Sequence, residues 1–295
     1  MLTKTPLRYP GGKSVMATLF ADMFNINHLE HVTYAEPYAG GAGTAIALLL
    51  ENRVDRIFIN DANVGVYSFW DSILRHTNEF VEKVQSIPIS LEEWRKQRNV
   101  FLNSNVPTFD LGFATFYLSR TNRSGILNAG PIGGNSEEKQ NKAKDKLGCR
   151  FNRDNLSEKI LQIAAKKRRI FVTNKDAIVF LKDLKGSGKF VYLDPPYYVK
   201  GKSLYLDFYQ HQDHVLLAEY LKSTLKFNWV LSYDNVEAIR NLYAGFDQYE
   251  FDLKYTANLK KYGAELLTYS KNLILPDKKE IRRAGENLKL KKIVL

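Results

Sequence analysis

A short apolar run ends abruptly at two adjacent prolines in residues 190–197, and this junction constrains the fold more than any other feature. Residues 190–193 have the length and composition of a buried strand. Because proline has no N–H and a fixed φ, the strand cannot continue past it. One point of the chain therefore presents a carboxylate, unused backbone carbonyls and an aromatic face, from Asp194, Pro195, Pro196 and Tyr197.

Such a group can hold a flat ring that bears an amine and leave its nitrogen exposed for reaction. A simpler alternative is a strand that prolines happen to end, with Tyr197 in the core. A four-residue match cannot decide between the two, so other parts of the chain must.

Short apolar segments alternate with helical ones along much of the sequence. We expect strands at 32–36, 56–60, 170–173, 190–193 and 228–232, and helices at 44 to about 52 and at 211–223. Residues 248–253 and 265–270 suit an antiparallel hairpin. This alternation predicts a doubly wound α/β sheet.

The alternation stops between 67 and 168, where helical patterns and long polar loops predominate. A loop of that length is unusual inside a compact domain, so we predict an inserted, mainly helical domain at 67–168. Residues 1–66 and 169–276 would form the main domain, and 277–295 a basic tail. For this tail we expect a solvated, frayed end at least as readily as a functional role.

The chain has 295 residues and a net charge of +11, which suggests a polyanionic partner. Residues 139–169 carry eleven Lys or Arg against three acids, so the insertion holds much of the excess. One cysteine, Cys149, excludes internal disulfides, and with five histidines no metal-ligand cluster stands out. Without a long apolar run or a signal-peptide core, a cytoplasmic protein is expected.

A glycine-rich turn follows the first expected strand, at residues 36–43. Glycines between a strand and a helix let the backbone approach a ligand closely. Asp61 ends the next strand, where an acid can bond the hydroxyls of a ribose. No phosphate-cradling lysine follows the turn, which argues against a nucleoside triphosphatase, and Glu36 suits a cationic or hydroxylated cofactor better than a pyrophosphate.

Residues 8–13, near the start of the chain, form a second loop of interest, with the sequence Arg-Tyr-Pro-Gly-Gly-Lys. A plain Pro-Gly turn before a helix is one interpretation. The other is a loop that closes over a bound cofactor through its backbone and Lys13.

Taken together, segment 8–13, the turn at 36–43, Asp61 and segment 194–197 resemble the conserved sections of Dam-type N6-adenine DNA methyltransferases, the D12 family. Their order resembles the alpha class, in which a target-recognition domain lies between the cofactor-binding sections and the Asp-Pro-Pro-Tyr. Residues 174–176 and 265–267 add further matches, and the resemblance covers roughly 6–273.

The resemblance implies a Rossmann-like methyltransferase fold, S-adenosyl-L-methionine (AdoMet) as cofactor and double-stranded DNA as partner. Asp61 would hold the ribose, Asp176 would lie near the cofactor adenine, and Tyr197 would stack on a target base flipped out of the duplex. Asp194 would touch both the cofactor and the target amine. The full implied cofactor site is Tyr9, Gly12, Lys13, Glu36, Pro37, Tyr38, Gly40, Gly43, Asp61, Asp176 and Asp194.

The insertion contains a segment, 117–125, that resembles the part of the family that reaches DNA bases and phosphates. Positions 119 and 121–124 depart from the GATC-specific enzymes, so the target sequence does not follow from the resemblance. Guanidinium groups suit guanine edges and phosphates, and Asn suits adenine. The candidate DNA contacts are Arg120, Asn122, Arg123, Arg150 and Arg153.

For the reaction, we expect Asp194 and the Pro195 carbonyl to accept the two N6 hydrogens, so that the nitrogen lone pair points at the donated methyl group. Positioning and electrostatics would supply the acceleration, without a metal. C5-cytosine methylation needs a cysteine nucleophile after proline, and Cys149 follows glycine. N4-cytosine methylation, methylation of RNA or of a release factor, and a catalytically silent nucleic-acid-binding protein remain alternatives. A monomer is expected.

Overall fold

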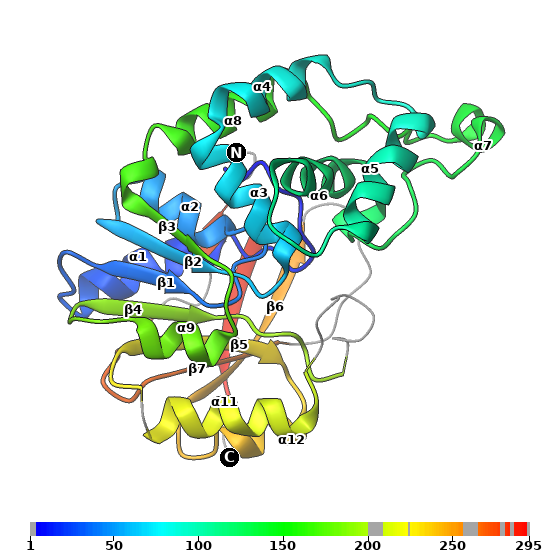
Figure 1. Cartoon of the computed structure of the whole chain (residues 1–295). Coiled ribbons are helices and arrows are strands. Elements are labelled where there is room, and N and C mark those ends of the chain that lie inside the picture. Colours follow the sequence, from blue (N-terminus) through cyan, green and yellow to red (C-terminus); the bar gives the residue numbers. More distant parts are fainter. Residues whose placement is uncertain are drawn as a thin grey trace.

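The computed structural model describes residues 4–199, 209–223, 225–255, 265–277, 281–283 and 286–293. Within these residues the centre is a nine-stranded sheet with the strand order β3-β2-β1-β4-β5-β7-β6-β9-β8 (Figure 1). Its strands are β1 (Thr33–Glu36), β2 (Arg56–Asn60), β3 (Ile170–Thr173), β4 (Lys189–Leu193), β5 (Asn228–Asp234), β6 (Gln248–Tyr255), β7 (Glu265–Tyr269), β8 (Ile281–Arg283) and β9 (Glu286–Lys292).

The first five strands form the parallel half of the sheet. β1 pairs with β2 on one side and with β4 on the other, and β3 and β5 extend the two flanks. The chain order therefore reverses between β1 and β4, and in open α/β sheets ligands bind at such a point, outside the carboxyl ends of the strands. The expected strands and the α/β class are confirmed.

Helices cover both faces of the sheet. They are α1 (Met16–Ile26), α2 (Gly43–Leu50), α3 (Val64–Arg75), α9 (Ala177–Asp183), α11 (His211–Ser223) and α12 (Glu237–Leu242). Tyr34 of β1 packs in a core with α1, α2 and α3, whereas its neighbour Ala35 packs in a second core with α9, α11 and α12. Successive strand residues face opposite sides, so each strand contributes to two cores and needs apolar residues throughout.

The segment between α3 and β3 is helical, as expected. Its elements are α4 (Thr77–Ser86), α5 (Leu91–Asn103), α6 (Phe109–Thr121), α7 (Glu137–Lys142), α8 (Arg153–Ala164) and the short 3₁₀ turns η1 (Arg123–Gly125) and η2 (Lys167–Arg169). Ser90, Thr108 and Asn152 each accept a backbone N–H at a helix start, as residues of these types favour.

Helix α6 is the centre of this helical segment, and nearly all of its residues are buried. It crosses α3 closely at Gly112, where an added Cβ would lie 2.4 Å from the Ser68 carbonyl oxygen. Phe80 and Phe116 belong to the same core as Tyr34 of the sheet. The expected boundary between 66 and 67 falls inside α3, and the inserted helices share one core with the first helical layer.

The C-terminal part of the sheet is antiparallel. β6 and β7 pair as the expected hairpin, and β7 also pairs with β5. β9 pairs with β6 and β8 with β9, so part of 277–295 extends the sheet. A frayed end is therefore wrong for this part: Ile281 and Leu288 are buried, and the apolar residues that alternate with the basic ones pack on the core. None of the helices in the described residues combines the length and apolarity that a bilayer crossing requires.

Candidate active site

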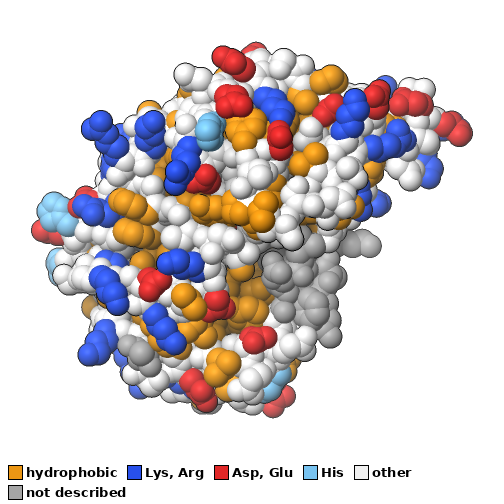
Figure 2. Space-filling view, viewed as in Figure 1, with side chains coloured by type: hydrophobic (Ala, Val, Ile, Leu, Met, Phe, Trp, Pro, Cys, Tyr) orange, Lys and Arg blue, Asp and Glu red, His pale blue; other side chains and the backbone are white. Residues whose placement is uncertain are grey.

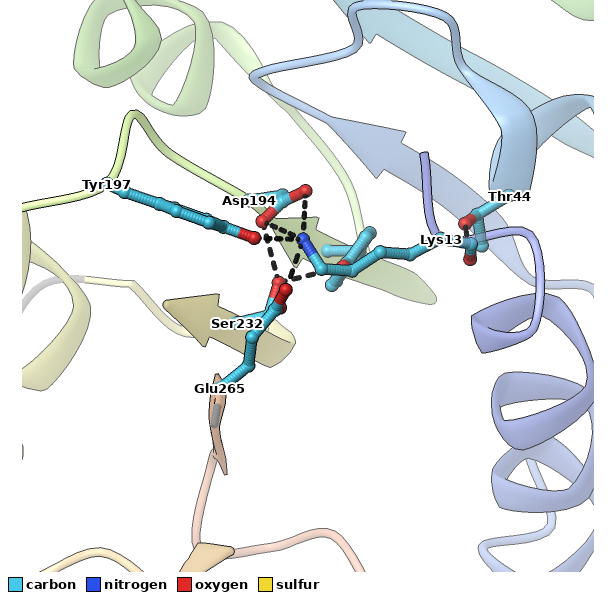
Figure 3. Close-up of polar contacts among 7 residues, drawn as sticks. Lys13, Thr44, Asp194, Tyr197, Ser232 and Glu265 are labelled. Atoms are coloured by element: carbon cyan, nitrogen blue, oxygen red, sulfur yellow. Dashed lines mark hydrogen bonds and ion pairs between the residues drawn. The ribbon is translucent and has the colours of Figure 1, made fainter. Parts of the chain in front are cut away.

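The side chain of Asp194 meets Lys13 at the carboxyl end of β4 (Figure 3). The Lys13 ammonium lies 2.7 Å from each Asp194 carboxylate oxygen and donates to the Tyr197 hydroxyl at 2.8 Å. Lys13 lies just before α1, and Thr44 of α2 bonds its carbonyl at 3.0 Å. Two loops far apart in the sequence, 8–13 and 194–197, thus meet at one point.

Two further side chains complete this cluster from the neighbouring strands. Ser232 of β5 donates to Asp194 Oδ1 at 2.9 Å, and the Tyr192 hydroxyl lies 2.8 Å from Ser232 Oγ. Glu265, the first residue of β7, places Oε2 3.3 Å from Lys13 Nζ. In this cluster the Lys13 ammonium therefore contacts two carboxylates, while the Tyr197 hydroxyl bonds the ammonium and the Ser232 hydroxyl bonds Asp194.

Burial governs the electrostatics of the cluster. The Lys13 side chain is 1% exposed, and burial alone would disfavour its charge, but Asp194 and Glu265 outweigh that penalty and raise its pKa well above the usual value. Burial also raises the pKa of Glu265, against the attraction of Lys13. Lys13 therefore stays charged, and it compensates two largely buried carboxylates that would otherwise have no cation beside them.

The glycine turn and Asp61 form a second part of the site. Gly40 N–H donates to Asp61 Oδ2 at 2.8 Å, and Asn63 N–H donates to Oδ1 at 2.9 Å. The Trp70 indole of α3 donates to the Gly40 carbonyl at 3.0 Å, and Asn60 of β2 donates to the Pro37 carbonyl. These bonds fix the turn against the end of β2, at the topological switch point.

Tyr9 packs directly on this turn. Gly40 has φ +46°, and a Cβ there would lie 2.7 Å from the Tyr9 ring. Segment 8–13 thus covers the glycine turn with Tyr9 and reaches Asp194 with Lys13. Gly12 is exposed on this segment, which places it at the surface beside the turn.

Gly40→Ala is expected to lower the free energy of unfolding by more than about 2 kcal/mol. A left-handed backbone costs a side-chain-bearing residue about 1–2 kcal/mol, and the clash with Tyr9 adds to that. Gly43→Ala is the control, because its Cβ would lie 3.9 Å from its nearest neighbour, Thr5. Urea unfolding of both variants measures the difference. Equal stabilities would show that neither the left-handed backbone nor the contact with Tyr9 makes an alanine at position 40 destabilising.

Glu36 ends β1 and is buried. Its Oε1 accepts from the Tyr34 hydroxyl at 2.8 Å and from Ala45 N–H of α2 at 3.0 Å. Burial raises the pKa of Glu36 to about 8, although both hydrogen bonds oppose the rise. In the absence of a cationic ligand, the carboxyl therefore holds a proton at neutral pH.

This pKa predicts a pH dependence of stability. The unfolded carboxyl titrates near 4.5 and the folded one near 8, so between these values the folded state binds the extra proton. Stability then falls as the pH rises from about 5 to 8, by up to about 1.4 kcal/mol per pH unit. Glu36→Gln keeps an acceptor for both bonds and should flatten this slope in urea unfolding at pH 5, 6, 7 and 8. An unchanged slope would mean that Glu36 is ionised throughout.

Two other predicted cofactor residues lie along the same edge of the sheet. Asp176 follows β3 and caps α9, where Oδ1 accepts from Ile178 and Val179 N–H at 2.9 and 3.1 Å. The Tyr38 hydroxyl lies 2.8 Å from the hydroxyl of Tyr209. Asp176 therefore has a structural role at a helix start, just beyond the carboxyl end of β3.

The structure gives three of the five predicted DNA-contacting residues internal roles. Arg120 donates to the Pro6 and Thr5 carbonyls, and burial lowers its pKa to about 10. Arg153 donates to the Val84 and Ile87 carbonyls, the latter at 2.5 Å. These guanidinium groups satisfy backbone carbonyls, and their contact with DNA stays a prediction.

Asn122 is the third of these residues and is fully buried. Its Oδ1 accepts from the Trp94 indole at 2.7 Å, and its amide donates to the Ile126 and Leu127 carbonyls at 3.0 and 2.8 Å. With these bonds made, Asn122 holds a loop and has no access to a base. Arg123 and Arg150, in contrast, are exposed.

Neither Glu265 nor Ser232 is among the site residues that the sequence predicts. Residues 265–267 resemble a section of the family, and a carboxylate at the start of an apolar strand is the signal that points to Glu265. Ser232 carries no such signal, because a serine within an apolar strand is common. In the described part of the chain, no group of three or more His, Cys, Asp or Glu is arranged to hold a metal ion.

The sheet order, the glycine turn at the switch point and the Asp194 cluster together define a methyltransferase of the doubly wound α/β type. The family model described as D12 class N6 adenine-specific DNA methyltransferase matches residues 9–257, and the chain belongs to this family. The family acts on adenine N6 in DNA, which decides among the reactions that the residues left open.

One curated relative is the Type II methyltransferase M.CviBI of Paramecium bursaria Chlorella virus NC1A. It is 24% identical over 280 residues, which cover 87% of this chain and 92% of the relative. A solved structure, a conserved hypothetical protein of Streptococcus pyogenes, matches with 11% identity and a TM-score of 0.31 over 84% of this chain and 92% of that one. A likeness at that level carries no argument about this protein.

Proposed function

We propose that Asp194 and the carbonyl of Pro195 accept the two hydrogens of a target adenine N6, and that AdoMet donates the methyl group. The observation that carries this is the pair of 2.7 Å bonds from Lys13 to both oxygens of Asp194. They mark this carboxylate, at the carboxyl end of β4, as a preformed acceptor for a nitrogen donor. A target amine would donate to a lone pair that Lys13 leaves available.

The nitrogen lone pair of adenine N6 is delocalised into the ring and is a poor nucleophile. Two acceptors that bind the N6 hydrogens would draw the nitrogen out of the ring plane and aim its lone pair at the methyl group. In the transfer, the N–C bond would form as the S–C bond of AdoMet breaks and its sulfur leaves as a thioether, and the Asp194 carboxylate would be the first acceptor of the departing N6 proton. Positioning and electrostatics supply the acceleration.

The residues at the switch point fit AdoMet. Glu36, Asp61 and Asp194 lie at or just beyond the carboxyl ends of β1, β2 and β4, and an acidic, glycine-lined edge suits a sulfonium and a ribose diol. Bound there, AdoMet supplies an activated methyl group. We propose that segment 8–13 covers the cofactor, that Asp61 bonds the ribose and that Asp176 lies by the adenine. The remaining contacts would come from Pro37, Tyr38, Gly40 and Gly43.

The Glu36 carboxyl has a further part in this proposal. Its pKa of about 8 reflects burial without a cation, so a bound sulfonium would favour the ionised form. Cofactor binding at neutral pH would then release a proton. Isothermal titration in buffers of different ionisation enthalpy measures that release.

The partner is double-stranded DNA, with the target adenine flipped into the site. Tyr197 is 8% exposed and lies against Lys13, from where its ring would stack on the base. Arg123 and Arg150 are the exposed members of the predicted DNA-contacting set. We further propose that the enzyme acts as a monomer, since one chain supplies every member of the Asp194 cluster.

The test is incubation of the purified protein with methyl-labelled AdoMet and duplex DNA, followed by nucleoside analysis. Label in N6-methyladenine is the expected result. Label in N4-methylcytosine would contradict the choice of base, and label in RNA with none in any natural DNA would contradict the substrate. Equilibrium binding of AdoMet to the same preparation tests the cofactor separately.

A further inference from the structure

The exposed charges of the molecule do not single out a further site. Figure 2 shows Lys and Arg side chains spread over this face, with Asp and Glu side chains among them. Charges that face water interact weakly, because the solvent screens them. The charged groups around Lys13 differ, because they lie largely in the interior, where each one needs a partner.

Glu265 presents an acceptor that the proposed reaction leaves without a role. Its side chain is 15% exposed, and its Oε2 atom is buried without a hydrogen bond of normal geometry to any described residue. Lys13 Nζ lies 3.3 Å from this atom. A carboxylate oxygen left unbonded in the interior is costly, so its presence calls for a function.

The Lys13 ammonium lies between Glu265 and Asp194, as Figure 3 shows. An ammonium has three N–H groups. Both oxygens of Asp194, at 2.7 Å, and the Tyr197 hydroxyl, at 2.8 Å, already accept from Lys13. Glu265 is therefore a fourth acceptor around a group with three donors, and rotation about the Cε–Nζ bond would turn an N–H toward it.

Asp194 is a poor final site for the proton that the proposed reaction delivers to it. A proton on one of its oxygens turns an acceptor into an O–H donor, which then faces an N–H donor of Lys13. The target base and AdoMet would cover the other side of Asp194 in the proposed complex and keep water away. The remaining way out for the proton leads through Lys13.

Glu265 has the properties of a final acceptor. Burial raises the pKa of its carboxyl, so it holds a proton more readily than an exposed glutamate does. Burial lowers the pKa of Lys13, but the two carboxylates outweigh burial and raise it well above the usual value, so Lys13 is charged again once a proton has passed. The three groups carry one net negative charge before the transfer and none after it, which removes an excess charge from the interior.

We propose that Lys13 relays the proton that leaves N6 to Glu265, which is the final acceptor within the cluster. An N–H bond of N6 breaks as an O–H bond forms on Asp194. Asp194 then gives that proton to Lys13 Nζ, while Lys13 gives one of its own to Glu265 Oε2. Asp194 ends as a carboxylate, Lys13 as an ammonium and Glu265 as a neutral carboxyl. Glu265 thus acts through Lys13, and the relay rests on the proposed function, since adenine N6 supplies the proton.

The titratable groups that face Glu265 come from the segment before α1, from β4 with the residues after it, and from β5. Phe251, opposite Glu265 on β6, carries no charge. Asp234, opposite it on β5, already accepts two backbone N–H groups at 2.8 Å. In the described part of the chain the set is Lys13, Tyr192, Asp194, Tyr197 and Asp234. A variant at position 265 leaves all of them in place, so it isolates the contribution of one carboxyl.

The test is single-turnover methyl transfer from labelled AdoMet to duplex DNA, both saturating, between about pH 6 and 9. Glu265→Gln keeps the size of the side chain but cannot take up a proton, so transfer should slow by about 10²-fold, with unchanged equilibrium affinities for AdoMet and DNA. In the wild-type protein the rate should rise with pH as Glu265 loses its resting proton, and the variant should lack this rise. Glu36 titrates in both proteins, so the difference belongs to position 265.

Chemical rescue separates proton transfer from packing. Glu265→Ala leaves room for a small carboxylate, and added formate should raise its transfer rate by about tenfold over chloride at the same ionic strength. A loss that came from packing alone would respond to neither anion. Glu250→Gln is the matched control, because Glu250 lies on the neighbouring strand β6 and accepts from Asn235 Nδ2 at 2.7 Å, so the rate should not change.

The outcomes separate the relay from the proposed function. A Glu265→Gln protein that transfers methyl groups within about threefold of the wild-type rate would overturn the relay and leave the proposed function standing. A slow variant that keeps the wild-type pH profile would also overturn it, because Glu265 would then support the site without taking up a proton. If the wild-type protein transfers no methyl group to adenine, N6 supplies no proton, and the relay fails together with the proposed function.

Discussion

Replacing Asp194 by asparagine is expected to lower kcat by about 10²–10³-fold, with little change in the affinity for duplex DNA. The variant keeps the shape of the side chain but loses the charge, and its amide can present a donor to the N6 amine in place of an acceptor. Removing one preorganised electrostatic contact from a reaction centre costs about this much. Single-turnover transfer from labelled AdoMet, with DNA affinity measured in parallel, gives both quantities.

Ser232→Ala is the matched control for that experiment. It removes one hydrogen bond from Asp194 Oδ1 and leaves the carboxylate in place, so kcat should fall by less than about tenfold. Asp194→Ala should abolish transfer. An Asp194→Ala protein that still methylates DNA would show that Asp194 does not take part in the chemistry, and equal losses in the Asn and Ser232 variants would give Asp194 a structural role alone.

Lys13→Met is expected to reduce the free energy of unfolding by about 3–5 kcal/mol at neutral pH, the usual cost of leaving a buried charge unpaired. Methionine fills much of the same volume but leaves Asp194 and Glu265 without their shared cation. The loss should shrink as the pH is lowered. Burial already raises the pKa of Glu265, and without Lys13 nothing as strong opposes that rise, so the folded variant takes up a proton. Urea unfolding at several pH values measures both effects.

The double variant Lys13→Met, Glu265→Gln separates charge from packing. Its stability should exceed that of Lys13→Met, because one of the two buried carboxylates is now neutral. The two substitutions are in direct contact, so their effects should not add. If the double variant is less stable than Lys13→Met by the full effect of Glu265→Gln alone, then Glu265 and Lys13 do not interact, and the cluster is not held by charge.

That segment 194–197 and the glycine turn lie at one edge of the sheet could be predicted from the sequence for a simple physical reason. Residues 36–43, Asp61 and Asp194 each follow a short apolar run, and the carboxyl ends of parallel strands meet at one edge of a sheet. The local patterns that predict the strands therefore also predict which strand-end residues lie together at that edge of the sheet. The hairpin 248–253 with 265–270 follows from alternation in the same way.

The partners of Asp194 could not be predicted in that way. Lys13 lies 181 positions before it, and no periodicity links the two. The meeting depends on how segment 8–13 crosses the glycine turn, with Tyr9 against Gly40 and Thr44 on the Lys13 carbonyl. Glu265 arrives from an antiparallel strand beyond β5, so its place depends on the order of strands in the finished sheet.

The sequence by itself determined the α/β sheet, the edge at which the candidate site lies and the excess of positive charge, because these depend on local apolar patterns and composition. Only the tertiary structure decided which polar residues of the insertion face outward. Asn122 and Arg123 are polar neighbours in the sequence, yet one holds a loop together in the interior and the other is exposed. Burial separates them, and burial depends on how α5, α6 and the loop after η1 pack, which no local pattern contains.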